Sequence, residues 1–252
     1  PKGRKVAPAY LDDFHATIGT IWRVWWGTAQ SSRPTNGVQN WPGPALATLA
    51  EELTTSSNLD HAYVGREPRE PYDNDQNGGN WLFRKPFYDM YHCNATATEA
   101  LQHLDKPGVQ YLDDDGTDHT PRARYWTKMM QGLCHLYIGL MYDQGYTLDE
   151  SIPDLTKYDY ANNLKPYHEV VQFGIDKLEE AIALAEAAPL DTIPGVENWL
   201  NARTCPDNST KNCVINKPDV STGTAACTNC TTLVEFMHSM IARGYAYNAR
   251  RP

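Results

Sequence analysis

The run DNDQNG at residues 73–78 is the segment whose residue types and spacing best fit a chemical role. Alternate oxygen-bearing side chains open a calcium-binding loop in this way, and a glycine at the sixth position permits the tight turn. The twelfth position holds Arg84 instead of glutamate, so a bidentate ligand would have to come from elsewhere. The pattern indicates calcium bound by Asp73, Asp75 and Asn77, with an ordinary polar turn as the alternative.

Four of the six cysteines crowd into one polar segment, residues 204–231. They are Cys205, Cys213, Cys227 and Cys230, and only the last two have the spacing of a zinc knuckle. Because the segment is polar and carries glycosylation sequons, we expect disulfide bonds among these four in an oxidising compartment. Cys93 and Cys134 lie in predicted helices, either as buried free thiols or as a link between two helices.

Three asparagines stand in the N-x-[ST] pattern of glycan acceptors. Asn208 and Asn229 lie in the polar segment, where a glycan would be exposed, although a disulfide at Cys230 would compete with the second. Asn94 lies in a predicted helix, where such a sequon is more often accidental.

Charge and motif content exclude several classes of protein. The net charge is −9 and the pI about 5.3, which disfavours nucleic acid as a partner. The sequence has no HExxH, no GxSxG and no glycine-rich phosphate loop, so we expect no enzyme activity. It begins at Pro1 without an initiator methionine, which indicates a processed or truncated product.

Apolar residues at helical spacing predict helices over much of the chain. Pro86 marks the expected start of the third helix, and Thr120 is the expected N-cap of the fourth. A capping box of Thr232 and Glu235 opens the last one. The five earlier helices are predicted over residues 10–29, 43–55, 81–104, 120–142 and 166–186.

Two of these helices have informative faces. Residues 120–142 are apolar on two sides, which predicts a helix in the interior of the fold. Residues 166–186 have an inward stripe that contains Val171, Ile175 and Leu178. The charged residues of that helix are expected on its solvated outer face, namely Asp176, Lys177, Glu179 and Glu180.

The predicted fold is all-α, a single domain over residues 1–252 with long irregular loops and a Cys-rich insertion at about 204–231. The loops are expected at 30–42, 56–80, 105–120, 143–165 and 188–231. Small residues such as Gly132 and Gly139 would let paired helices approach closely. These features favour a tetratricopeptide-like helical-repeat stack.

The order of segments resembles the N-terminal, tetratricopeptide-containing half of the SusD/RagB family. These are outer-membrane nutrient-binding lipoproteins that partner a TonB-dependent transporter. The resemblance is carried by several stretches of sequence. They include ALATLAEELTTSS at 45–57, FYDMY at 87–91, the stretches at 125–146 and 166–186, and LVEFMHSMIARGYAYNAR at 233–250. Family members are typically about twice this long, and they often carry Asn where this chain has Thr98.

The resemblance implies a surface that binds glycans. Aromatic side chains in or beside loops could stack on sugar rings, although a Trp that packs its loop onto the core is the alternative. Asp191-Thr192-Ile193 is similar to the O-glycosylation sequence of bacteria rich in this family, with Thr192 as the acceptor. The aromatic candidates are Trp41, Tyr72, Trp81 and Trp199.

Two functions follow as expectations. The first is an extracytoplasmic, non-catalytic binding protein for a glycan or oligomeric nutrient, at the outer-membrane surface or secreted. The second is a self-assembling structural subunit of a glycosylated extracellular fibre, whose partners are copies of itself. This hypothesis rests on the last helix, which is rich in Met and Tyr, ends at Tyr245-Ala246-Tyr247 and would be an apolar flank that needs cover. Met237 and Met240 are predicted on the inward face of that helix.

Overall fold

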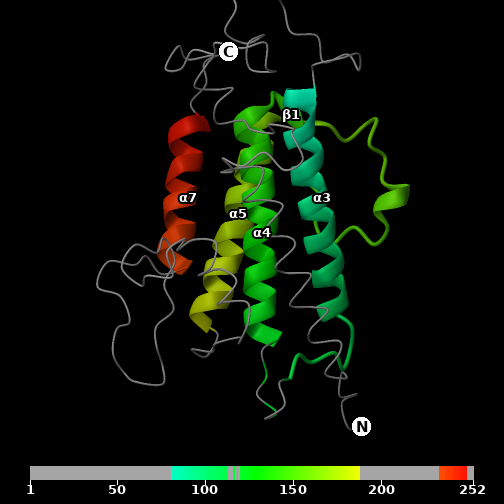
Figure 1. Cartoon of the computed structure of the whole chain (residues 1–252), viewed down its shortest axis with the longest axis vertical. Helices are drawn as coiled ribbons and strands as arrows, with labels where there is room; N and C mark the ends of the chain where they lie inside the picture. The colour runs from blue at the N-terminus through cyan, green and yellow to red at the C-terminus, as the bar shows by residue number, and fades with distance from the viewer. Residues whose placement is uncertain (1–80, 113–115, 117, 119, 188–232, 249–252) are drawn as a thin grey trace, which may run out of the picture.

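The computed structural model describes residues 81–112, 116, 118, 120–187 and 233–248. This part of the chain is mostly α-helical (Figure 1). Its helices are α3 (Trp81–Leu104), α4 (Thr120–Met141), α5 (Tyr167–Ala187) and α7 (Leu233–Asn248).

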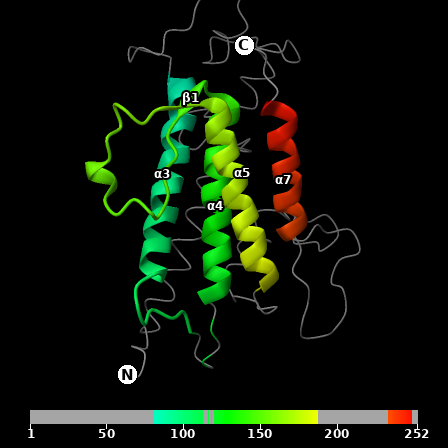
Figure 2. The ribbon, with the colours of Figure 1, turned by 180° about the vertical axis from the view of Figure 1, so that it is seen from behind.

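The helices stand side by side in the order α3, α4, α5, α7, and neighbours run in opposite directions (Figures 1 and 2). Helix α4 packs against the other three, so it occupies the interior position that its two apolar faces predict. Every residue from Trp126 to Gly139 is buried. The core consists of side chains from all four helices, with Trp126, Met90, Met129 and Leu133 among the largest.

Helices α4 and α5 touch through glycine, as the sequence predicts for Gly132 and Gly139. A Cβ on Gly139 would lie 2.8 Å from the backbone nitrogen of Val171. A third glycine, Gly174 of α5, faces α4 in the same way, since a Cβ there would lie 2.6 Å from the nitrogen of Leu136. Backbone therefore packs on backbone, which leaves no room for even a methyl group.

The connection from α4 to α5 is more ordered than the irregular loop that we predict from the sequence. Strands β1 (Gln144–Gly145) and β2 (Lys165–Pro166) pair antiparallel, with Gln144 opposite Pro166. Between them lies the short 3-10 helix η2 (Leu155–Lys157). Figures 1 and 2 show this connection as a loop that projects from the bundle beside α3.

Two expectations from the sequence are wrong. Helix α3 begins at Trp81 and not at Pro86, and it continues through this proline although Pro86 has no N–H to donate to the carbonyl of Leu82. Lys177 is buried at 8% exposure, not on the solvated face of α5. The inward position predicted for Met237 and Met240 is confirmed, because α7 packs on α5 and α4 of the same chain and buries both side chains.

Candidate functional site

Side chains of α3 and α4 hold residues 146–152, which we call the clamped segment. The Tyr91 hydroxyl donates to the Tyr146 carbonyl at 3.0 Å and accepts from the Tyr146 N–H. The Asn94 amide donates to the Leu148 carbonyl at 3.0 Å, and the Gln102 amide donates to the Ile152 carbonyl at 2.7 Å.

The clamped segment lies along one side of α3. From Tyr91 to Gln102, the first and the last of the three side chains, the helix rises about 16 Å. The carbonyls that they hold belong to residues 146, 148 and 152, and the segment turns before the last of these, where the Ile152 N–H donates to the Asp149 carbonyl at 3.2 Å. Side chains of α3 therefore satisfy part of the backbone of a segment that belongs to neither a helix nor a sheet.

His135 of α4 completes the clamp from the other side. Its Nδ1 lies 2.8 Å from the Gln131 carbonyl, and its Nε2 lies 3.1 Å from the Leu148 nitrogen. The Gln131 carbonyl can only accept, so Nδ1 carries a proton, and the Leu148 N–H can only donate, so Nε2 carries none. The ring is therefore neutral. Burial lowers the pKa of His135 to about 4.

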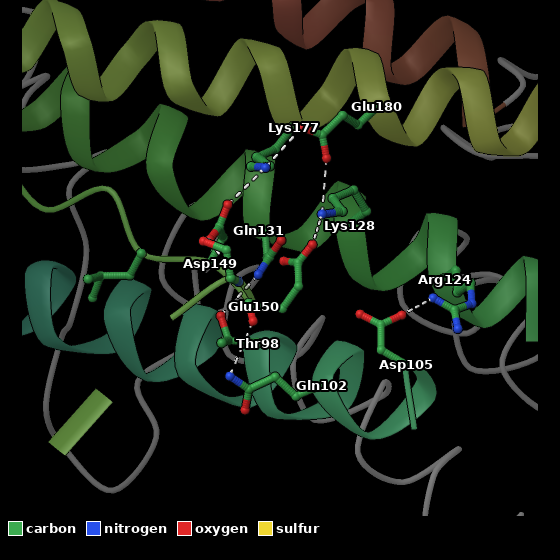
Figure 3. A network of polar contacts seen from close by, with 12 residues as sticks. Thr98, Gln102, Asp105, Arg124, Lys128, Gln131, Asp149, Glu150, Lys177 and Glu180 are labelled. Atoms are coloured by element: carbon green, nitrogen blue, oxygen red, sulfur yellow. Dashed lines mark hydrogen bonds and ion pairs between the residues drawn. The ribbon is translucent and has the colours of Figure 1, made fainter. Parts of the chain in front are cut away.

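A cluster of charged side chains joins α4, α5 and the clamped segment (Figure 3). Lys177 of α5 contacts Asp149 at 2.9 Å and Glu180 at 2.9 Å. Lys128 of α4 contacts Glu180 at 3.0 Å and also pairs with Glu150. Two lysines thus join three carboxylates, and two of these belong to the clamped segment.

These contacts set the charge states of the cluster. Burial alone would lower the pKa of Lys177, but its hydrogen bonds to Glu180 and Asp149 outweigh burial and raise it. For Asp149, burial opposes ionisation, yet hydrogen bonds from Ser151 and Lys177 lower its pKa. Burial likewise opposes ionisation of Glu180, and its contacts with Lys177 and Lys128 hold the pKa below its usual value. Lys177, Asp149 and Glu180 are therefore ionised at neutral pH, and the Lys177–Asp149 pair fastens the clamped segment to α5.

Acid should loosen the clamp. The folded state keeps His135 neutral down to about pH 4, whereas the unfolded chain binds a proton near pH 6.5. The unfolded state therefore binds more protons between these values, and stability falls as the pH falls. We expect the free energy of unfolding to drop by about 2 kcal/mol between pH 6.5 and 5. Urea unfolding at several pH values measures this drop, and His135→Gln should flatten it. An equal slope in the variant would contradict the assignment.

Tyrosine rings continue from the clamp into the projecting loop. Tyr91 meets Tyr146 edge to face at 5.7 Å between ring centroids, and Tyr146 meets Tyr160 at 5.2 Å. Tyr160 in turn meets Tyr158 at 5.0 Å. We call these four residues the tyrosine run. Tyr160 is its most exposed ring, at 39%, and we call it the outer ring.

Short-range hydrogen bonds fix the loop that carries the outer rings. Asp154 caps η2 by accepting from the Thr156 N–H at 3.0 Å. Asp159 accepts from the Asn162 amide at 2.8 Å, and the Tyr160 hydroxyl donates to the Leu155 carbonyl at 2.9 Å. Hydrogen bonds within the loop therefore hold the rings of Tyr158 and Tyr160 in place.

Most of the predicted site residues lie outside the described residues. Trp81 opens α3, but its side chain is not among those that the structure describes. Asn94 is fully buried and its amide donates to Leu148, so it is not an accessible glycan acceptor in this fold. Among the described residues, no group of three or more His, Cys, Asp or Glu could hold a metal. The predicted sites outside are Trp41, Tyr72, Trp199, Asp73, Asp75, Asn77, Cys205, Cys213, Cys227, Cys230, Asn208, Asn229 and Thr192.

Sequence reasoning missed the tyrosine run. Tyr158 and Tyr160 stand in YDYANN at 158–163, where the two tyrosines flank an aspartate and two asparagines follow. That composition was a usable signal, because tyrosines in a polar loop have no core of their own to fill.

Comparisons with protein-family models, with curated proteins and with solved structures return no match. None of the helices in the described part of the chain is both long and apolar enough to cross a membrane.

Proposed function

We propose that the chain is an extracytoplasmic, non-catalytic binding protein that recognises a glycan or an oligomeric nutrient, in the manner of the SusD/RagB family that its sequence resembles. The observation that carries the proposal is the tyrosine run, whose outer ring, Tyr160, is exposed on a loop fixed by its own hydrogen bonds. Flat rings with a polar edge suit the apolar faces and hydroxyl groups of sugars.

The surroundings of the run support a saccharide over a charged ligand. Asp159 and Asn162 beside the outer ring are exposed and can form hydrogen bonds with hydroxyl groups. Tyr88 on α3 adds a second exposed ring, 61% accessible, linked to the run through Phe87. Lys165, the cation of β2, already contacts Glu169 at 3.9 Å.

The non-catalytic character of the proposal rests on how the described reactive groups are engaged. His135 uses both ring nitrogens in the clamp, and burial raises the pKa of the Cys134 thiol. The carboxylates of the charged cluster are ion-paired. The proposal extends to a tetratricopeptide-like stack, supported by the antiparallel α4 and α5 pair and its glycine contacts. A TonB-dependent transporter as partner follows from the family resemblance alone.

Removing the outer rings should weaken glycan binding. We expect Tyr160→Ala to lower the affinity for an oligosaccharide ligand by roughly tenfold or more, because an aromatic anchor contributes about 2 kcal/mol. Tyr247→Ala is the matched control, since Tyr247 is exposed on α7, away from the run. Isothermal titration measures both variants. Equal affinities for wild type and Tyr160→Ala would contradict the assignment of the site.

The self-assembling fibre subunit is the second candidate. The buried Met237 and Met240 no longer favour it, but Tyr245 and Tyr247 on α7 are exposed and are open to contact with another copy. Light scattering from the same samples separates the two functions, since fibres scatter strongly and a binding protein remains small.

A further inference from the structure

Cys93 of α3 and Cys134 of α4 face each other in the core. Their Sγ atoms lie 2.7 Å apart, well inside the ordinary contact of two unbonded sulfur atoms. Both side chains are buried, and both lie on helices whose backbones are packed together. The two helices therefore already hold the sulfur atoms where a covalent bond needs only a small further approach.

Other chemistry fits this pair less well. Burial, followed by the contact with Cys93, raises the pKa of the Cys134 thiol, which disfavours the thiolate that a nucleophile requires. A metal would need further ligands, and the described residues offer no group of three or more His, Cys, Asp or Glu. A disulfide requires only the two sulfur atoms.

We propose that Cys93 and Cys134 form a disulfide bond that joins α3 to α4 when the chain folds under oxidising conditions. The two thiols lose two protons and two electrons as the S–S bond forms. A small-molecule disulfide or a disulfide oxidoreductase accepts them by thiol–disulfide exchange, so that its own S–S bond becomes two thiols. Because the native pair is buried, exchange takes place before the helices close over it.

The bond would act on the clamp. Cys93 lies between Tyr91 and Asn94, and Cys134 lies next to His135. Those three neighbours hold the clamped segment from opposite sides. A disulfide at this point fixes the register of α3 against α4, and with it the position of the segment that leads into the tyrosine run.

Refolding the full chain with oxidised glutathione tests the bond directly. After alkylation in denaturant, peptide mapping should show the Cys93 and Cys134 peptides joined until a reductant is added. The wild type should also melt about 5–15 °C higher than Cys93→Ala/Cys134→Ala without reductant, and this difference should shrink when reductant is present. The double variant retains the other four cysteines, so any bonds among them affect both proteins equally.

Three outcomes distinguish the disulfide from the proposed extracytoplasmic location. Alkylation of both thiols after oxidative refolding would overturn it, because the geometry would then fail under the conditions that favour the bond. Linked peptides after refolding, but free thiols in protein from its native cell, would instead contradict the extracytoplasmic location in the proposed function. Linked peptides in both samples support the bond and agree with that location.

Discussion

Replacing Lys177 by methionine should destabilise the fold by about 3 kcal/mol, measured as the loss in free energy of urea unfolding. Methionine preserves most of the buried stem but removes the charge. Asp149 would then lose its cation at 2.9 Å while it remains largely buried, and an unpaired buried carboxylate is costly.

Lys157→Met is the matched control for this prediction. Lys157 also pairs with an aspartate, Asp154 at 2.8 Å, but its side chain is 83% exposed. An exposed ion pair contributes little, so this variant should lose less than about 0.5 kcal/mol. Adding Asp149→Asn to Lys177→Met should recover part of the stability, because it removes the uncompensated charge. Equal losses for the two lysines would contradict the buried cluster.

Replacing Gly174 by alanine should also destabilise the fold by about 3 kcal/mol, at the upper end of the effect of overpacking. Alanine at an ordinary helix position stabilises by up to about 1 kcal/mol relative to glycine. A loss of stability in Gly174→Ala, instead of this gain, therefore indicates the close contact between the two helices. The added methyl would meet backbone atoms of α4, with Leu136 N at 2.6 Å and Gly132 O at 2.9 Å. Backbone cannot yield without separating the two helices.

Gly244→Ala provides the comparison. A Cβ there would meet only the ends of flexible side chains, Leu136 Cδ1 at 2.8 Å and Ile175 Cδ1 at 3.1 Å. Those atoms can move, so we expect a clearly smaller loss than for Gly174→Ala. Thermal unfolding of the two variants measures the difference. A neutral or stabilising Gly174→Ala would show that α4 and α5 do not approach as closely as the structure has them.

Helix existence and the interior position of α4 could be predicted because both follow from local apolar periodicity. The burial of Lys177 could have been predicted in part. It stands seven residues after Val170 and four before Ala181, on a second buried line of α5 that also includes Gly174. Residue type misled the prediction, because a lysine is usually solvated unless a partner from elsewhere in the chain meets it.

The clamp, and the Tyr91–Tyr146 contact that joins it to the tyrosine run, could not be predicted from local patterns. Asn94 and Leu148 are 54 residues apart, and Tyr91 and Tyr146 are 55 apart. Their contacts depend on how α3 packs against α4, which sequence spacing within one element does not specify. For the same reason, the sequence places Asn94 in a helix with a sequon that is more often accidental, but it does not show that this asparagine holds the backbone of Leu148.

The most direct test of the proposed function is isothermal titration of the full chain with oligosaccharides of increasing length from plant, microbial and animal polysaccharides, followed by chromatography of the recovered sugar. We predict that at least one series binds, with affinity that rises with the number of sugar rings, and that the sugar is recovered intact. No binding heat with any series at millimolar concentration would contradict glycan recognition. Recovery of shortened sugars would contradict the non-catalytic role.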